Sequence, residues 1–165
     1  MSFKSKNFGY SLVEMILYTA IVFAISTALI SMLITFSSTY RTLGALRIAE
    51  HSGIDAMERM TRDIRAAKTV TQGSSTLGSS PGVLTIVSTA TTTKFYIQGG
   101  ILKVDVNGSY FGPLTLSSAS VSNLVFTLLS SGISDAIKID MTVSGTVGAT
   151  TKTKNYRSTV ILKGQ

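Results

Sequence analysis

The sequence predicts an α+β fold in which one long N-terminal helix packs on an antiparallel β-sheet. Three observations lead to this prediction. Residues 15–36 form an apolar run of 22 residues without a charge, and no proline interrupts the chain from Tyr10 to Val70. Short β-type runs separated by turn signals follow from residue 83 onward. A chain of 165 residues has room for one globular domain beside the helix, and without cysteine it has no disulfide framework.

The apolar run, Met15 to Phe36, is predicted to cross a membrane as part of a transmembrane helix covering residues 10–36. At about 1.5 Å of rise per residue, a helix over the run reaches roughly 33 Å, enough for the hydrocarbon core of a bilayer. Glu14 lies at the mouth of this run between apolar neighbours. Because a charged side chain in a membrane helix is costly, this carboxylate needs a counter-charge.

Residues 1–9 offer a source for that counter-charge. They carry Lys4 and Lys6, contain no acid and end in Gly9, which is flexible enough to extend through a peptidase cleft. Cleavage after Gly9 would create an α-amino cation at Tyr10, about one helical turn from Glu14. The helix dipole also favours an acid in the first turn. We therefore interpret residues 1–9 as a leader peptide.

Together these residues resemble the processing site of bacterial type IV pilins and type II secretion pseudopilins. The resemblance rests on the basic leader with Phe8-Gly9, on the start Tyr10-Ser11-Leu12-Val13-Glu14-Met15 and on the uninterrupted apolar helix. It implies that a membrane-embedded prepilin peptidase cleaves after Gly9, that Tyr10 becomes N-methylated, and that Glu14 guides subunit docking in a helical filament. Tyrosine stands where phenylalanine is usual, and the span lacks the mid-helix proline of many major pilins.

Two other interpretations of the N-terminus stay open. A secretory signal would have an apolar core of about 7 to 15 residues and an A-x-A-like site, whereas this run is longer and ends in Phe36-Ser37-Ser38-Thr39-Tyr40. An uncleaved membrane anchor is the second, and it leaves the acid unexplained. Lys4 and Lys6 favour a cytoplasmic N-terminus and an extracytoplasmic C-terminal part, although Arg41 and Arg47 weaken the contrast.

Small residues recur within the span every four positions, at Ala20, Ala24 and Ala28. Small side chains at this spacing let helix backbones approach closely where lipid removes the hydrophobic drive for association. These alanines are therefore candidates for helix packing. A span of simply mixed composition explains them equally well.

Residues 37–70 are predicted to continue the helix as an amphipathic half. Apolar and small residues follow one another there in steps of three and four, while charged residues occupy the other faces. Such a stripe needs a cover, which the rest of the chain should supply. The stripe consists of Leu46, Ala49, Gly53, Met57, Met60, Ile64 and Ala67.

A second and less specific resemblance lies at the end of this helix. The stretch Arg59-x-x-Arg62-Asp63-Ile64-Arg65-x-Ala67 resembles the larger minor pilins and the larger minor pseudopilin of type II secretion. Physically, the spacing predicts i,i+4 ion pairs, Glu58 with Arg62 and Arg59 with Asp63. A salt-bridged, solvated surface explains the stretch, and docking of a partner is the alternative.

Residues 71–82, rich in glycine and serine, are predicted to link the helix to a β domain of residues 83–165. Gly99-Gly100 and Asn107-Gly108 predict tight hairpins, Pro113 interrupts the following region, and residues 144–155 are predicted to form a loop. Alternation of apolar with polar residues over 137–143 predicts one buried strand face. The expected strands are 83–88, 94–98, 101–106, 124–129, 136–143 and 156–162.

No catalytic motif is recognisable, so we expect no enzyme and no cofactor. His51 is the only histidine, which excludes a His-based triad or a multi-His metal site within one chain. The stretch Asp105-Val106-Asn107-Gly108-Ser109 faintly resembles the start of a calcium loop. Its twelfth position is Leu116 instead of glutamate, and a turn explains these residues without metal.

The net charge of +7 falls to +5 when Lys4 and Lys6 leave with the leader. A basic group near the C-terminus could contact DNA phosphates, but only Tyr156 is interleaved as a stacking platform. DNA binding is therefore a weaker alternative to a solvated or subunit-facing surface. The group consists of Lys152, Lys154, Arg157 and Lys163, with Lys94, Lys103 and Lys138 as further members.

From the residues and the resemblance we expect a minor pilin or pseudopilin, a structural subunit of a type IV pilus-like filament. Its expected partners are prepilin peptidase, other pilin subunits, the inner-membrane assembly platform and the membrane. A type II secretion piston and a DNA-uptake (competence) filament are alternatives within the class. An uncleaved, membrane-anchored extracytoplasmic binding domain is the alternative from another class. Before assembly the chain is expected in the cytoplasmic membrane, and afterwards in a periplasmic or cell-surface filament.

Overall fold

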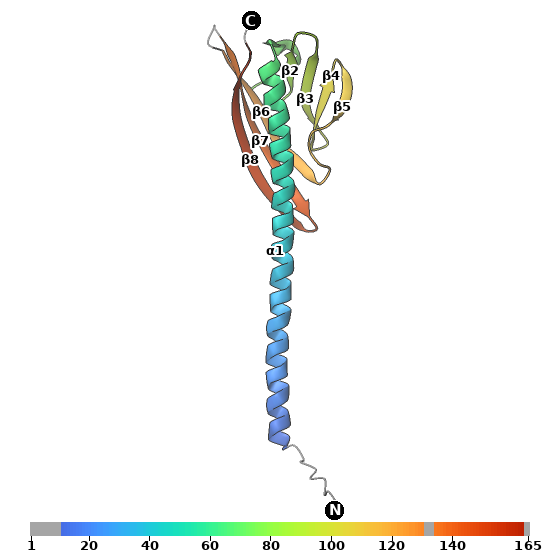
Figure 1. Cartoon of the computed structure of the whole chain (residues 1–165), viewed down its shortest axis with the longest axis vertical. Helices are drawn as coiled ribbons and strands as arrows, with labels where there is room; N and C mark the ends of the chain where they lie inside the picture. Colours follow the sequence, from blue (N-terminus) through green and yellow to red (C-terminus); the bar gives the residue numbers. More distant parts are fainter. Residues whose placement is uncertain (1–10, 131–133, 164–165) are drawn as a thin grey trace, which may run out of the picture. The chain divides into compact units, whose positions relative to one another are not determined.

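The computed structural model of this chain describes residues 11–130 and 134–163 (Figure 1). Helix α1 runs from Leu12 to Ala66 and is followed by antiparallel strands in two sheets. The predicted α+β class with a long N-terminal helix is therefore confirmed, with two sheets in place of the expected one. The residues up to Tyr40 and those from Arg41 onward form separate compact units, which are described in turn.

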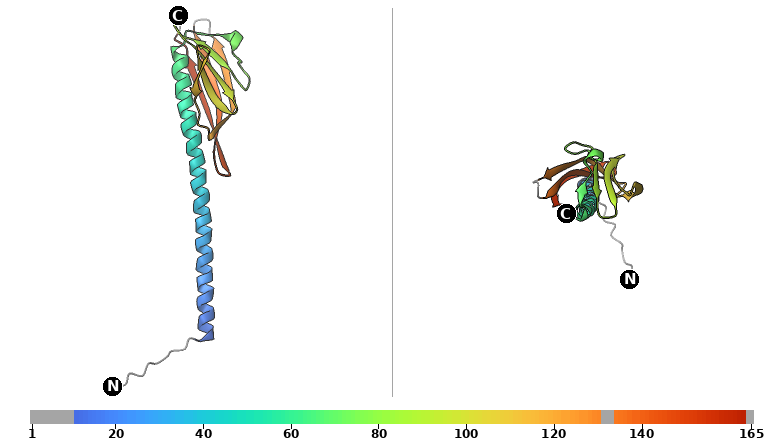
Figure 2. Two further views of the ribbon diagram at one scale, coloured as in Figure 1. Left: turned by 90° about the vertical axis from the view of Figure 1, so that its right-hand side faces the viewer. Right: turned by 90° about the horizontal axis from the view of Figure 1, so that it is seen from above.

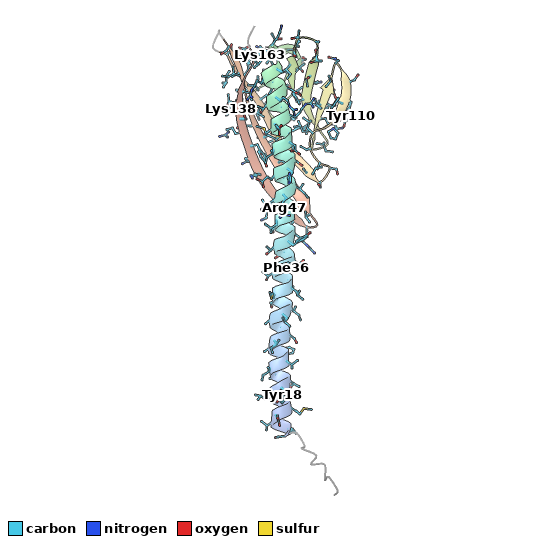
Figure 3. All side chains as sticks on the ribbon, in the orientation of Figure 1. Tyr18, Phe36, Arg47, Tyr110, Lys138 and Lys163 are labelled. Carbon is cyan, nitrogen blue, oxygen red and sulfur yellow. The ribbon has the colours of Figure 1, made fainter. Side chains whose placement is uncertain are left out.

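The first part of α1, Leu12 to Tyr40, is here called the exposed segment. It contains neither glycine nor proline, and most of its hydroxyl side chains donate to carbonyls of the preceding helical turn. Its large apolar side chains are 47–76% exposed and project from the helix on all sides (Figure 3). The back-bonding residues are Thr19, Thr27, Ser31, Thr35, Ser38 and Thr39.

The second part of α1, Arg41 to Ala66, is here called the packed segment, because one stripe of it is buried on the strands. The stripe begins with small residues and ends with large ones, and its members recur mostly in steps of three and four, which is the spacing of one helix face. The predicted stripe is confirmed in most positions, but Leu46 is 37% exposed. The buried residues are Ala45, Ala49, Ser52, Gly53, Ala56, Met60 and Ile64.

The predicted end of the helix at Val70 is wrong, because α1 stops at Ala66. The backbone N–H of Lys68 donates to the carbonyl of Val87 (2.8 Å), and Thr69–Val70 forms the short strand β1. Two β-branched residues in succession favour extended backbone, and pairing with the next strand, β2 (Leu84–Val87), satisfies their polar groups. The amphipathic part of the helix is therefore shorter than residues 37–70.

The first sheet has the strand order β1-β2-β3-β4-β5, with all neighbours antiparallel. Its strands after β1 are β2 (Leu84–Val87), β3 (Thr92–Gln98), β4 (Ile101–Val106) and β5 (Ser109–Pro113). Both predicted hairpins are confirmed: positive φ angles occur at Gly99 and Gly100 between β3 and β4, and at Asn107 and Gly108 between β4 and β5. The 71–82 connection contains the short 3-10 helix η1 (Gln72–Ser74).

The second sheet has the order β6-β7-β8, formed by β6 (Ala119–Ser130), β7 (Asp135–Val147) and β8 (Thr150–Ile161). The predicted loop over residues 144–155 is wrong: β7 and β8 stay paired up to Val147 and Thr150, around a turn with positive φ at Gly148. Cross-strand hydroxyl pairs such as Ser144–Thr153 (2.8 Å) support this pairing. The Ser/Thr-rich stretch thus forms strands despite its polarity.

One core joins the packed segment of α1 to both sheets. Met60 and Ile64 belong to the same buried cluster as Phe95 of the first sheet and Phe126 of the second. Seen from above, strands of the two sheets lie on either side of the helix (Figure 2). The predicted alternation in β7 is confirmed, since the buried residues over positions 137–143 are Ile137, Ile139, Met141 and Val143.

Candidate functional site

The predicted cleavage site, Gly9 and Tyr10, lies outside the described residues. Cleavage after Gly9 and methylation of Tyr10 therefore stay predictions. The described part of the chain begins directly behind them, at Ser11.

Glu14 lies in the first turn of α1 and is partly exposed. The N–H of Met15 donates to the carbonyl of Ser11 (3.2 Å), so Ser11 occupies the N-cap position and Glu14 is three residues into the helix. Serine followed three positions later by glutamate is the capping-box pattern, in which the acid helps to satisfy the first N–H groups of a helix. Helix capping is therefore a local explanation of Glu14 that competes with subunit docking.

Ala20, Ala24 and Ala28 are all exposed on the exposed segment of α1. At about 100° per residue, successive members are offset by about 40°, so they form a slowly turning stripe on one side of the helix. The hydroxyls of Thr27, Ser31 and Thr35 are bonded to the helix itself and present no unpaired donor. This side of α1 therefore allows a close approach of another helix.

The exposed segment is also long and apolar enough to cross a membrane as a single span. None of its apolar side chains is buried by the described residues. A face of this size without cover is rare in soluble monomers and marks a surface for lipid or protein. The physical requirement is a cover for the whole circumference, which a bilayer or a bundle of helices supplies.

A second candidate site is a groove of about 860 Å³ between the packed segment of α1 and strand β8. Ile54, Met57 and Tyr156 give it an apolar floor, and Arg62 and Lys163 belong to its basic rim. The labelled Lys163 lies beside the last turns of α1 (Figure 3). Below we call this feature the α1–β8 groove; it is lined by Ile54, Met57, Glu58, Thr61, Arg62, Arg65, Ala66, Tyr156, Arg157, Ser158 and Lys163.

Tyr156, in the middle of β8, connects this strand to the helix. Its hydroxyl donates to the carbonyl of Ala49 (3.1 Å), and burial raises the pKa of this phenol. Its ring lies where a side chain at position 53 would project, which explains glycine at that position of the buried stripe. Beside it, Lys154 donates to Glu50 (2.7 Å), which lowers the pKa of Glu50 and raises that of Lys154.

The predicted C-terminal basic group is not one continuous patch. Lys138 donates to Asp140, and Arg157 also pairs with it; these bonds lower the pKa of Asp140. Lys94 and Lys103 lie on β3 and β4 of the other sheet, over tyrosine rings. Several of the cations are thus neutralised or dispersed, which weakens the case for a surface that follows a DNA backbone.

The arginines at the helix end have two different environments. Arg59 pairs with Asp63 (2.8 Å), as the i,i+4 spacing predicts, and stacks over Phe111. The second predicted pair does not form: Glu58 and Arg62 both lie within the described chain, and neither makes an ion pair there. Arg62 and Arg65 instead face the α1–β8 groove.

The calcium-like stretch forms the β4–β5 turn. Asn107 accepts the N–H of Thr92 with its side-chain oxygen (2.8 Å), and Asp105 accepts the hydroxyl of Tyr96 (3.0 Å). Burial and this carboxylate raise the pKa of Tyr96. Within residues 11–130 and 134–163, no group of three acidic, histidine or cysteine side chains could hold a metal ion.

Sequence analysis missed the α1–β8 groove. Its residues belong to two segments nearly a hundred positions apart, and although a strand was predicted over residues 156–162, its place beside the end of the helix was not. A partial signal was present in the unpaired arginines near the helix end and in the basic C-terminal residues.

Comparisons of this chain with known protein families, curated proteins and solved structures found no match.

Proposed function

We propose that this chain is a structural subunit of a type IV pilus-like filament, a minor pilin or pseudopilin, made with a leader that prepilin peptidase removes after Gly9. The observation that carries this proposal is the exposed segment of α1. Its apolar side chains lack any cover among the described residues, and an acid stands in its first turn. A helix of this kind can lie in a bilayer before assembly and in a helical bundle afterwards.

In this proposal Glu14 and the new amine at Tyr10 set the axial register between neighbouring subunits. An acid that enters a bundle of apolar helices requires a cation, and the terminus of the next subunit supplies one. The stripe of Ala20, Ala24 and Ala28 allows the helices to pack closely. The unit from Arg41 onward presents the outer surface. The chain performs no chemistry itself, so energy for movement comes from the assembly platform.

The first test is the mature N-terminus. We expect mass spectrometry of the protein from its native cells to show a chain that begins at Tyr10 and carries one added methyl group. An intact Met1 would support the uncleaved, membrane-anchored binding domain instead. A chain that has lost the whole span would support an ordinary secretory signal.

The second test separates docking from helix capping at Glu14. Glu14→Gln removes the charge but keeps a side chain that fits the capping box, whereas Glu14→Ala removes both. We expect both variants to be cleaved normally and both to be depleted from sheared filaments at least tenfold. If Glu14→Gln assembles like the wild type while Glu14→Ala does not, the acid serves as a cap, and the docking role is wrong.

A third comparison distinguishes systems within the class. Deletion of the chain is expected to reduce pilus number if it belongs to a pilus, export of folded proteins if it belongs to a type II secretion piston, and DNA uptake if it belongs to a competence filament. Each phenotype is measured in the same deletion strain.

A further inference from the structure

We propose that the α1–β8 groove binds an extended acidic segment of a different protein, which adds to the sheet as a further strand beside β8. This proposal goes beyond the filament role, because it requires neither cleavage after Gly9 nor assembly. Two features of the groove specify the occupant. One wall is a strand edge that no other described strand pairs with, and the rim carries cations that form no ion pair within residues 11–130 and 134–163.

The free edge follows from the register of the second sheet. β8 is the last strand of that sheet and pairs with β7 without a bulge from Thr150 to Ile161. The N–H of Leu162 donates to Asp135 on the β7 side (2.9 Å). Because hydrogen-bonding direction alternates along a strand, residues at odd positions direct their N–H and C=O groups away from β7. These residues are Thr151, Thr153, Asn155, Arg157, Thr159 and Ile161.

The outward groups of β8 make no backbone hydrogen bond to another segment within the described chain. The opposite edge of the same sheet differs: on β6, the carbonyls of Leu124 and Phe126 accept from Gly82 and Gly78, and the N–H of Val121 donates to Gly100. The fold therefore covers one edge and leaves the other open. An open edge favours the addition of an extended segment through main-chain hydrogen bonds.

The groove beside this edge has the dimensions of a strand. Arg157, whose backbone points outward, lines it together with Ile54 and Arg65 on α1. These two helical positions are about 16 Å apart along the axis, a distance that about five strand residues cover. Ile54 is 49% exposed, so an added strand would remove an apolar side chain from water.

Charge selects the chemistry of the occupant. Arg62, Arg65 and Lys163 make no ion pair with any described residue, and Glu58 is the only acid that lines the groove. The net attraction is therefore for carboxylates, and arginine can bind them through two parallel hydrogen bonds. A basic or neutral strand would gain only the main-chain bonds.

A second copy of this chain does not supply such a segment. After α1, its acids are Asp105, Asp135 and Asp140, none of which are adjacent or at alternate positions of one strand. The residues of the leader contain no acid at all. The occupant is therefore a segment of another protein that carries two acids on one face of an extended stretch.

The test uses the full chain in uncharged detergent micelles and a synthetic peptide of about six residues. The peptide alternates threonine with valine at one end and with glutamate at the other, so that it can place apolar residues near Ile54 and carboxylates near Arg65. We expect fluorescence anisotropy to show saturable binding of this peptide. A peptide with lysine in place of glutamate should bind at least tenfold more weakly.

Variants locate the site. Arg62→Glu combined with Arg65→Glu is expected to weaken peptide binding at least tenfold, whereas Arg47→Glu, on an exposed part of the same helix, leaves it unchanged. Thr159→Pro removes one outward N–H while the bonds to β7 remain, and is expected to weaken binding several-fold. A peptide N-methylated at alternate amides, which cannot form the strand pairing, should lose binding.

Hydrogen exchange provides the decisive measurement. On addition of the acidic peptide, the amides of Asn155, Arg157 and Thr159 should become protected, while those of Ser158 and Val160 stay as they were. Binding that leaves these outward amides unprotected, or that survives the double charge reversal, would overturn the proposal. So would a complete failure of the acidic peptide to bind the correctly folded wild-type chain.

Discussion

The two parts of α1 share one helix and differ in what covers them. The exposed segment has large apolar side chains on every side and no cover within the described chain, whereas the packed segment carries small residues and a narrow buried stripe. In the packed segment, alanine and glycine let strands approach the helix backbone. In the exposed segment, no described residue covers the stripe of alanines. Similar small residues thus lie under strands in one part and are uncovered in the other, where they would pack against a neighbouring subunit in the proposed filament.

The largest effect on the free energy of unfolding is expected from a comparison of two methionines of α1. Met60 is fully buried, while Met32 is 70% exposed. Met60→Ala should lower the free energy of unfolding by about 2–5 kcal/mol, because it removes buried contacts and leaves a cavity. Met32→Ala should leave unfolding of the unit from Arg41 onward unchanged. Urea denaturation of the full chain in detergent, followed by tyrosine fluorescence, measures both, and equal effects would contradict the division of the helix.

A smaller effect is expected from added volume at the packed segment. A side chain at Gly145 on β7 would meet the backbone of α1 at Ala45 and Ala49, which cannot move aside as a flexible side chain would. Gly145→Ala should therefore destabilise by about 1–3 kcal/mol. Gly73→Ala, where a methyl group meets nothing within 4 Å, is the matched control. Equal denaturation midpoints for the two variants would mean that β7 is not held closely against the helix.

The smallest effect on stability is expected from the surface charges of the unit from Arg41 onward. Hydrogen bonds lower the pKa of Glu50 and of Asp140 below their ordinary values of 4.5 and 3.8. Their contribution to stability is therefore complete above those values and is lost as the pH falls through the lower values of the folded state. Glu50→Gln combined with Asp140→Asn should flatten the acid side of the stability curve slightly, since exposed pairs contribute little.

Denaturation midpoints measured from pH 7 down to about pH 3 test this charge effect, over the range in which free carboxylates titrate. The wild type should lose more stability than the double variant below about pH 4.5. Parallel curves would show that the ion pairs of Glu50 and Asp140 contribute nothing measurable to the stability of the unit from Arg41 onward.

The sequence by itself determined the elements that depend on local preferences. The uncharged run of residues 15–36 predicts a helix because a helix satisfies the backbone polar groups within a single segment. Gly99-Gly100 and Asn107-Gly108 predict hairpins because few residues tolerate positive φ. The alternation in β7 and the stripe of the packed segment were also predictable. Buried residues recur at every second position of a half-buried strand and at every third or fourth position of a helix. The signature around Gly9, Tyr10 and Glu14 is likewise a property of sequence alone.

Only the tertiary structure decided the features that depend on pairing between distant segments. Thr69 and Val70 became a strand because β2 offers hydrogen bonds, and the polar stretch of residues 144–155 became two strands because it pairs with itself and lies against α1. The division of the basic residues into neutralised pairs and a basic groove rim was decided in the same way. Such contacts join residues far apart in the chain, and their free energy exists only once the fold has brought them together.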